Sequence, residues 1–515
     1  MYKKGVILII ISMMCTGFLY AQHKKIICKA DSLMYDEAFM PGVERLLGSV
    51  VFYHENTIGY CDSAYNYSAL NQIECFGKVV RIHVNDSVTL YGKHVLYDAN
   101  LKMATIDGNV ILMDPTTSLY TDTLHYDLNK DVGYYLTGGK ILNGENTVTS
   151  REGHYFSKKD EFILKGKVHL VNYDYVMDCE SLTYNTKNKI VYFTSRTLLV
   201  AKEDSSTIET SGGWYNTDQD VSFLVGDVEM HKTAQKVLGD TIFYDKNLGF
   251  AILRSNVSVV DTAKNYILQG HYVEYFEKGG MSMATRNAML TLIDDTQDSL
   301  FLHGDTLNIL IDSVQDPQLM LAYNHVKFFR ADMQGACDSL SYQMTDSLLT
   351  MFYNPVVWSG ENQLSADTIR FYMLPEDNMR AEFIKSGFIV ASLYDDTEFN
   401  QIKGVNITGF IRNKQLYQVD VENNAECLYY IQEEDSSLVG INYSLTSEMT
   451  IMLEDNKVSH ITFYNNPDGK IYPDSAMSRE DRILKEFRWL KEYRPEKIED
   501  IFVMPMPRKK TIEGN

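Results

Sequence analysis

Proline is scarce in this sequence, with 10 residues in 515, and half of them stand after residue 465. With 45% hydrophobic and 12% aromatic residues, the chain has ample material for a packed core or an extended repeat array. Intrinsic disorder is therefore excluded for most of its length. The rise in proline density near residue 465 predicts a change of structure there.

The apolar run near the N-terminus is shorter than the roughly 20 residues that a membrane-spanning helix needs. It covers residues 6–19, follows two lysines and leads to Ala21. This order of charge, short apolar segment and small residue predicts a signal peptide over residues 1–21, with an uncleaved anchor as the alternative. Because Cys15 follows the bulky Met14, no lipid attachment is expected.

No Cys-x-x-Cys pair occurs, so the ligand spacing of a zinc site or a redox motif is missing. Outside the predicted signal peptide the cysteines are Cys28, Cys61, Cys75, Cys179, Cys337 and Cys427. Buried free thiols are the favoured interpretation. A disulfide between Cys28 and Cys61 on adjacent repeats is the alternative in an oxidising compartment.

Positive charge is in deficit, with 48 basic against 69 acidic residues and a net charge of −21. Such a chain repels phosphate backbones, which excludes nucleic acid as a partner. None of the common nucleophile, phosphate-loop, dinucleotide or zinc-protease motifs occurs. We therefore expect no enzyme activity, no catalytic residues, no metal and no cofactor. The aspartates that recur ahead of strands are read as turn and edge residues rather than acid/base groups or calcium ligands.

What the sequence does contain is an internal repeat of about 30 residues. Its first half reads Asp, Thr or Ser, an apolar residue, any residue, then Tyr, as in residues 122–126, 240–244 and 338–342. The apolar residue and the tyrosine are two positions apart, which places them on one face of a strand. Six of these apolar residues are expected to point between two sheets: Leu33, Leu124, Leu182, Ile242, Leu340 and Ile369.

The second half of each unit alternates around Gly or Asn, as at Gly108-Asn109, Gly166 and Gly226. Because these residues tolerate positive φ, they predict a β-bulge or tight bend between two short strands. One unit cannot bury its apolar face alone, whereas stacked copies bury a continuous core. The predicted fold is all-β: an elongated open β jelly roll of about twelve or more such repeats, with two facing antiparallel sheets.

The array is expected to cover residues 22–465. The repeat gap lengthens around Pro317, which predicts a seam between two sub-barrels near residues 310–319. Residues 466–515 would form a proline-rich tail.

Within that tail, Ser478 with Asp481 three residues later is typical of a helix start. Ile483, Phe487 and Leu490 follow at helical spacing. The sequence therefore predicts one short C-terminal helix at about residues 478–494, which would cap the last sheet edge.

The two half-motifs, repeated behind a signal peptide, resemble the organic-solvent-tolerance (OstA/LptA-like) family of lipopolysaccharide transport, and most of all its long Bacteroidetes versions. The resemblance covers about residues 26 to 465. It implies a periplasmic bridge or chaperone that shelters lipid A acyl chains in an apolar groove on their way to the outer membrane. It also implies the periplasm, with association at the outer membrane, as location. Other transport proteins would join by edge-to-edge β pairing.

By that resemblance, the lipid groove would be lined by the inward pair of each motif, among them Leu124, Tyr126, Leu182, Tyr184, Ile242 and Tyr244. The alternative for the tyrosines is a packed core ladder. The alternative for the whole chain is a β-solenoid scaffold or adhesin of the envelope that transports nothing. The chain departs from a single-domain bridge in its length and in its tail.

Overall fold

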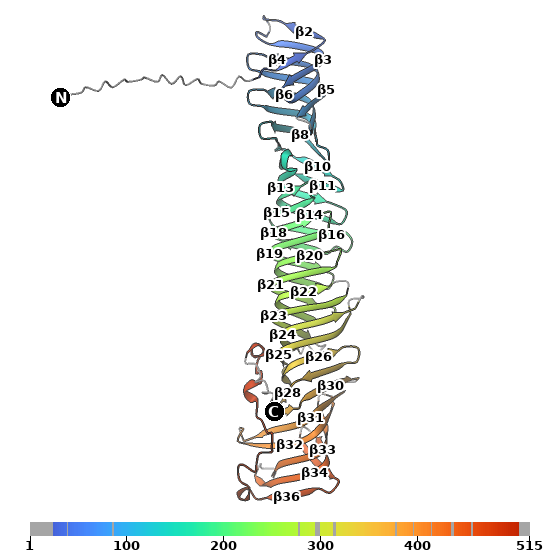
Figure 1. The fold of residues 1–515 in the computed structure, drawn as a ribbon, viewed down its shortest axis with the longest axis vertical. Helices are drawn as coiled ribbons and strands as arrows, with labels where there is room; N and C mark the ends of the chain where they lie inside the picture. The colour runs from blue at the N-terminus through green and yellow to red at the C-terminus, as the bar shows by residue number, and fades with distance from the viewer. Residues whose placement is uncertain are drawn as a thin grey trace, which may run out of the picture. The chain divides into compact units, whose positions relative to one another are not determined.

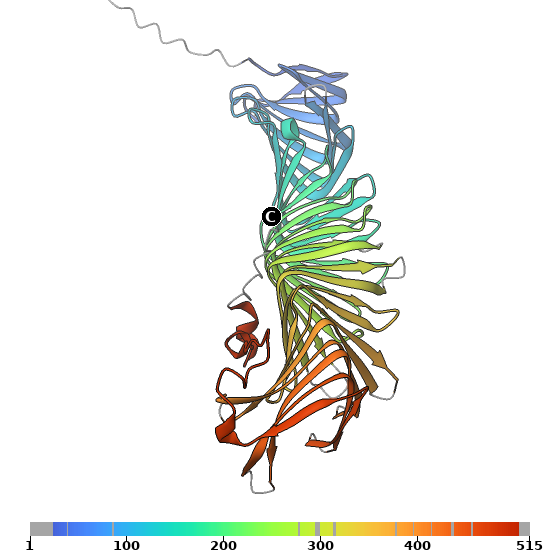
Figure 2. The same cartoon turned by 60° about the horizontal axis from the view of Figure 1, so that its bottom comes forward.

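The computed structural model describes residues 24–503, except residues 39, 85–86, 277–278, 294–298, 313–315, 376–377, 395, 414, 434–436 and 455–456. The predicted signal peptide, Cys15 and residues 504–515 lie outside the described residues. The chain divides into two compact units (Figures 1 and 2). Unit 1 is Met1–Tyr173 with Glu180–Asn188, and unit 2 is Asp174–Cys179 with Lys189–Asn515.

Unit 1 consists of antiparallel strands of 3 to 13 residues. They are β1 (Ile27–Lys29), β2 (Ser32–Tyr35), β3 (Glu44–His54), β4 (Thr57–Tyr67), β5 (Gln72–Val84), β6 (Val88–Asp98), β7 (Met103–Met113), β8 (Thr117–Asp127), β9 (Val132–Tyr135), β10 (Gly139–Asn143), β11 (Asn146–Ser150), β12 (Glu152–Phe156) and β13 (Glu161–Val171), with the 3-10 turn η1 (Ser157–Lys159). The strand β14 (Tyr175–Asn185) has residues in both units.

Unit 2 continues the pattern with antiparallel strands of 4 to 18 residues. They are β15 (Ile190–Phe193), β16 (Thr197–Ala201), β17 (Thr207–Thr210), β18 (Gly212–Asn216), β19 (Val221–Lys232), β20 (Gln235–Asp245), β21 (Phe250–Asp261), β22 (Tyr266–Phe276), β23 (Gly280–Ile293), β24 (Ser299–Ile311), β25 (Pro317–Phe329), β26 (Gln334–Gln343), β27 (Leu348–Phe352), β28 (Val356–Ser359), β29 (Asn362–Ser365), β30 (Thr368–Leu374), β31 (Asn378–Leu393), β32 (Glu398–Arg412), β33 (Gln415–Gln432), β34 (Leu438–Glu454), β35 (Lys457–Tyr464) and β36 (Asp468–Tyr472).

The predicted bulges are confirmed. Between Asp107 and Val110 the register of β7 against β8 shifts by one residue, and Gly108 and Asn109 both have positive φ. The same pair of positive-φ residues recurs at Gly166-Lys167 and Gly226-Asp227. Positive φ costs least for Gly, which is the first residue of all three pairs.

The described strands form one continuous antiparallel sheet, and the bulges divide each long strand into two halves that lie in two layers. We call layer one the halves that carry the tyrosine motif, and layer two the halves on the other side of the bulge. In β7, Ala104 and Ile106 are buried before the bulge, and Val110 and Leu112 after it. Alternation on both sides of the bend gives each layer one apolar face.

Five of the six motif residues expected between the sheets are buried: Leu124, Leu182, Ile242, Leu340 and Ile369. Leu33 is the exception, with 60% of its surface exposed. It lies opposite the buried Leu46 and so shares its face. The expectation of burial is wrong for Leu33 because β2 is a terminal strand, paired among the described residues with β3 alone.

The predicted helix over residues 478–494 is absent. That stretch holds turns and only the three-residue 3-10 turn η3 (Lys491–Tyr493), between η2 (Asp474–Ala476) and η4 (Ile498–Phe502). The Ser478 hydroxyl and the Asp481 carboxylate do bond, at 2.6 Å, but the turn they make is not continued. The backbone beyond it bonds to side chains of the sheet instead.

The unit boundary falls at residues 173–189, where β14 has residues in both units. Residues 310–319, where the sequence favoured a seam, lie inside unit 2. There Leu310 of β24 pairs with Leu319 of β25.

Candidate ligand cavity of unit 2

The motif residues of unit 1 lie in a closed core. Leu124, Tyr126, Leu182 and Tyr184 have no exposed surface. The Tyr184 hydroxyl donates to Asn143 Oδ1 at 2.7 Å and accepts from Asn146 Nδ2 at 2.9 Å. Tyr126 Oη lies 3.2 Å from Ser157 Oγ. With their hydroxyls satisfied internally, these side chains pack as a core ladder.

Ile242 and Tyr244, in unit 2, are placed differently. Both line a cavity of about 540 Å³ between the two layers. Ile242 is buried, whereas Tyr244 is only partly buried. The six groove residues predicted from sequence thus separate into four that pack and two that face a space large enough for part of a lipid.

The floor of the cavity is apolar. Layer one contributes Ile242, Leu253 and Tyr275, and layer two contributes Val237 and Val259. The two contributions follow from alternation, since Leu253 and Val259 lie on either side of the bulge in β21. Ile208, Met230 and Ala251 complete the apolar lining.

The layer-two residues are not among the predicted groove residues. Val237 and Val259 belong to the second half of the repeat, for which the sequence predicts bends. The signal was available, because Val257 and Val259 alternate directly after the bulge at Ser255-Asn256.

The mouth of the cavity is charged. Lys246 Nζ pairs with Asp174 Oδ1 at 2.9 Å and lies 5.3 Å from the centre of the Tyr175 ring. Lys232 Nζ lies 3.7 Å from Asp204 Oδ2. An apolar floor under a rim of both charges fits an amphipathic ligand whose polar end remains near water.

These ion pairs hold the rim charged near neutral pH. Burial opposes the charged form of Lys246, but the hydrogen bond to Asp174 and the charges of Tyr175, Asp174 and Asp220 together raise the lysine pKa. Hydrogen bonds from Ser206, with Lys232 nearby, lower the pKa of Asp204. Burial is the main cause that raises the pKa of Tyr175, so its hydroxyl stays neutral.

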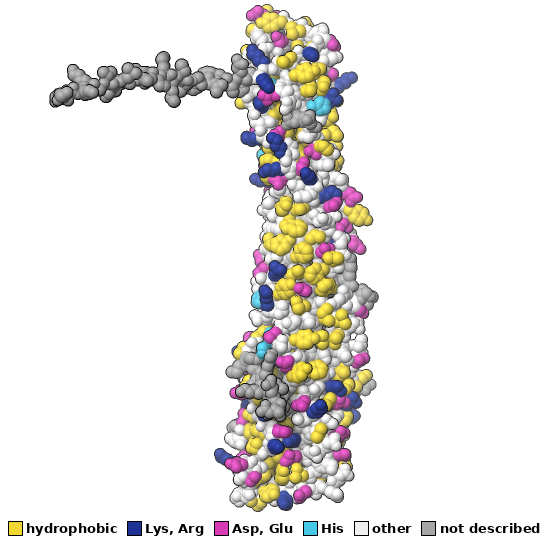
Figure 3. Space-filling model, viewed as in Figure 1, with side chains coloured by type: hydrophobic (Ala, Val, Ile, Leu, Met, Phe, Trp, Pro, Cys, Tyr) yellow, Lys and Arg dark blue, Asp and Glu magenta, His cyan; other side chains and the backbone are white. Residues whose placement is uncertain are grey.

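A second apolar surface lies on the outward face of layer one. Tyr192, Trp214, Phe223, Phe243 and Ile252 follow one another across the strands, each opposite the next. Figure 3 shows hydrophobic side chains gathered over the middle strands of unit 2.

The part of the chain that the structure describes holds no group of three or more His, Cys, Asp or Glu side chains placed to bind a metal ion. Cys28 and Cys61 are free thiols rather than a disulfide. No helix among the described residues has the length and hydropathy to cross a membrane.

The family described as OstA-like protein matches residues 22–180. The match covers this part of the chain, which is similar to OstA-like proteins. The OstA-like segment ends close to the boundary of unit 1, and the cavity of unit 2 begins at Asp174, near its end. The same strand, bulge and strand pattern continues past residue 180, so unit 2 repeats the architecture of the OstA-like segment.

Two solved structures are similar to this chain at low sequence identity. One is the crystal structure of LptH, the LptA-homologous periplasmic component of the lipopolysaccharide transport device of Pseudomonas aeruginosa, at 16% identity, covering 21% of this chain and 80% of that chain with a TM-score of 0.20. Another is the extracellular domain of a putative hybrid two-component system of B. thetaiotaomicron, at 7% identity, 85% and 93% coverage and a TM-score of 0.10. Such TM-scores carry no argument about this chain. No curated protein matches it.

Proposed function

We propose that this chain is a periplasmic lipid carrier of the lipopolysaccharide transport system, which holds its ligand by the acyl chains in the cavity of unit 2. The observation that carries the proposal is the apolar floor beneath a charged rim, in a chain whose first unit is OstA-like. As in that family, the direction of transport would be toward the outer membrane.

Hydrophobic burial is the expected source of affinity. Each CH₂ group that leaves water contributes roughly 0.8 kcal/mol, so a few buried carbons of each acyl chain outweigh any single polar contact. The net charge of −21 disfavours long-range attraction of an anionic glycolipid. The ligand phosphates would therefore meet local rim groups such as Lys232 and Lys246, and binding should persist in added salt.

The other proteins of the transport system would join this chain at its terminal strands. Unpaired strand edges are templates for β-augmentation. Among the described residues, β1 and β2 pair only with β3, and β35 and β36 only with β34. These edges support the proposal that partners add strands there.

The test fills the cavity without adding charge. Val237→Trp places a large ring in the space between the layers. Its matched control is Leu238→Trp, because the next residue of β20 points to the opposite face. Photo-crosslinking to lipopolysaccharide and its salt dependence are measured for both, with circular dichroism to establish that each protein is folded.

We expect Val237→Trp to lower capture about tenfold or more and Leu238→Trp to leave it within about twofold. A folded Val237→Trp protein that captures lipopolysaccharide like the wild type would place the ligand elsewhere. Capture abolished by salt in the wild type would show that the phosphates dominate. Absence of capture in the wild type would favour the scaffold alternative.

A further inference from the structure

The segment that follows β36 lies along unit 2 as a strap, which we define as residues 477–503. It is drawn in dark red beside the strands in Figures 1 and 2. Its far end reaches β24 and β25, where Lys327 Nζ donates to the Val503 carbonyl at 2.5 Å and the His303 ring lies 4.6 Å from that of Phe502.

The strand register decides which face of layer two the strap covers. Val259 lines the cavity, and one cross-strand row leads from it to Val357 and on to Ile402. Directly opposed residues share a face, so this whole row points inward. Trp358, one residue further along β28, therefore points outward, and Trp358 is the residue that packs with Leu490 of the strap.

Three glutamines in the outward row hold the strap. Gln334, Gln363 and Gln401 alternate in this row with Trp358 and Val390, and each is almost fully buried. A glutamine on every second strand presents its amide about 9.5 Å from the next. Such regular buried amides require regular partners.

The strap supplies those partners with a repeat of its own. Residues 482–487 read Arg-Ile-Leu-Lys-Glu-Phe, and residues 488–493 read Arg-Trp-Leu-Lys-Glu-Tyr. Six extended residues would span up to about 20 Å, twice the glutamine spacing. Each hexapeptide contains one turn, which shortens it toward the glutamine spacing. In these turns Phe487 N bonds to the Leu484 carbonyl and Tyr493 N to the Leu490 carbonyl.

Gln401 and Gln363 each bind one hexapeptide. Gln401 donates to the Arg482 carbonyl at 2.7 Å and accepts from Leu484 N at 2.8 Å. Gln363 makes the same two bonds with Arg488 and Leu490, both at 2.7 Å. Gln334 Oε1 accepts from Arg494 Nε at 2.8 Å. A side chain that pairs with both backbone groups of an extended segment acts like a neighbouring strand.

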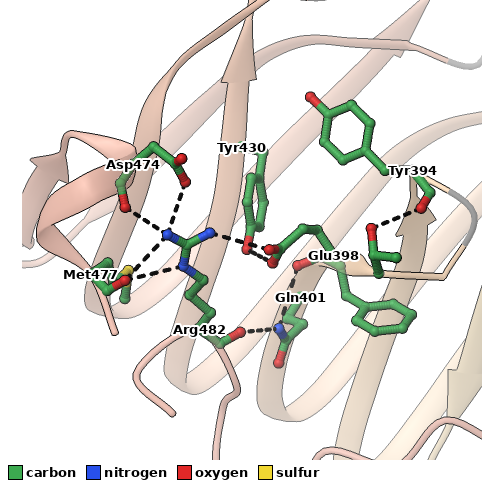
Figure 4. A network of polar contacts seen from close by, with 9 residues as sticks. Tyr394, Glu398, Gln401, Tyr430, Asp474, Met477 and Arg482 are labelled. Atoms are coloured by element: carbon green, nitrogen blue, oxygen red, sulfur yellow. Dashed lines mark hydrogen bonds and ion pairs between the residues drawn. The ribbon is translucent and has the colours of Figure 1, made fainter. Parts of the chain in front are cut away.

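Ion pairs fasten the start of the strap (Figure 4). Arg482 binds Glu398 Oε1 at 3.1 Å and Asp474 Oδ1 at 2.8 Å, and Tyr430 donates to the same Glu398. Apolar contacts complete the fit, because the Phe399 ring lies 5.0 Å from Phe487 and 5.1 Å from Trp489. The strap is thus a third layer with its own core.

In the strands beneath the strap, the outward-facing side chains are more buried than the inward-facing ones. Outward residues Gln363, Val390 and Gln401 are at most 1% exposed. The inward residues beside them, Leu364, Ile389 and Ile402, are only partly buried, although the same row is 6% exposed or less at Val259, Leu268, Leu290 and Leu302. Consecutive apolar side chains that point inward yet remain partly open form a surface for an apolar ligand.

We propose that the strap is a clasp, which buries the outward face of β29 to β32 and so allows Leu364, Ile389 and Ile402 on the inward face to receive the apolar part of a ligand. This inference rests on the proposed function, because it extends the ligand path from the cavity along the same row. Without the strap these strands would be poorly buried on both faces.

The experiment releases the strap in the full chain. Gln363→Leu with Gln401→Leu keeps the outward row apolar but removes the amides that hold two hexapeptides. Gln415→Leu with Gln432→Leu, at exposed positions of β33, is the matched control. Trypsin reports release, since Lys or Arg stands at every third strap position from Arg482 to Lys497. Leu484→Asp is a second releasing variant, because it puts a carboxylate into the strap core.

Ligand contact is measured with a photoreactive amino acid at Ile402 or at Val237, with lipopolysaccharide as the probe. We expect labelling at both positions in the otherwise wild-type chain. Strap release should lower labelling at Ile402 about tenfold and leave Val237 within about twofold. Unchanged labelling at Ile402 after the strap becomes trypsin-sensitive overturns the clasp. So does labelling at Val237 without any at Ile402, or resistance to trypsin in both releasing variants. Labelling at neither position refutes the proposed function itself.

Discussion

At the scale of single residues, the repeating tyrosines combine a buried ring with a hydroxyl that needs a partner. In unit 1 the partners come from the core: Asn143 and Asn146 for Tyr184, and Ser150 for Tyr135 at 2.6 Å. A satisfied hydroxyl fixes the ring and excludes water. In unit 1 the tyrosine side chains therefore fill the space between the two layers. In unit 2 Tyr244 lines a cavity in that space.

We expect Tyr184→Phe to destabilise the folded protein by about 1–3 kcal/mol, because two buried asparagines lose a shared partner. Tyr173→Phe is the control, since Tyr173 is 78% exposed and its change should stay within about 0.5 kcal/mol. Urea unfolding followed by circular dichroism measures both. Equal midpoints would show that Tyr184 contributes only its ring.

Alkaline pH should also weaken unit 1. Burial raises the pKa of Tyr126 and of Tyr135 from 10 to about 12. Since the unfolded rings ionise first, stability that is complete below about pH 10 should be lost as pH rises toward 12, by about 2 kcal/mol per ring. Unfolding midpoints against pH, with tyrosinate absorbance, test this. In Tyr135→Phe the slope should be shallower, and an unchanged slope would contradict the assignment.

At the scale of elements, the bulge is what converts one strand into two layers. Gly108 has φ of +84°, and a Cβ there would lie 3.1 Å from Lys93 Cβ. Gly239, by contrast, lacks positive φ, and its nearest neighbour would be 3.7 Å away. The two glycines differ in conformation and in space.

Gly108→Ala should therefore cost about 1–2 kcal/mol, the penalty of a left-handed backbone for an L-residue. Gly239→Ala should be neutral or slightly stabilising, because alanine restricts the unfolded chain. Thermal unfolding of the two variants, compared with the wild type, decides between these outcomes. A stable Gly108→Ala protein would mean that the bend relaxes to negative φ.

The bulges and strand faces could be predicted because their signals are local: residue types that tolerate positive φ, and alternation of period two. The helix prediction failed because Ile483, Phe487 and Leu490 satisfy helical spacing as well as a hexapeptide repeat. Only the buried Gln363 and Gln401, far away in sequence, favour the extended form. Ile242 and Tyr244 line the cavity, but the sequence could not predict the cavity itself, because its size depends on the separation of two layers and not on any one strand.

At the scale of the whole molecule, we propose that another chain adds at the exposed terminal strand β2. Leu33, Met34 and Tyr35 are 60%, 54% and 52% exposed. Natural proteins protect such edges with charge, and lysine is the usual choice. The exposed side chains of β2 are apolar instead. This favours β2 as an edge that pairs with another strand over an edge that is protected from pairing.

Leu33→Lys combined with Tyr35→Lys should abolish edge-dependent association without unfolding the chain. Leu70→Lys is the control, because Leu70 is 56% exposed in a turn between β4 and β5. Sedimentation measures self-association, and site-specific crosslinking at β2 measures contact with other transport proteins. Wild-type association in the double variant would exclude β2 as the docking edge.

Because the spacing of the glutamines matches the spacing of the hexapeptides, the length of the strap is tied to the number of strands that it crosses. Arg482, Arg488 and Arg494 are six residues apart, and each step corresponds to two strands of layer two. Gain or loss of one β-repeat in this region would move every later glutamine by two strands, which corresponds to one hexapeptide of the strap. Evolution can therefore change the number of repeats here only together with a six-residue insertion or deletion in the tail, so the lengths of two distant parts of the gene are inherited as a pair.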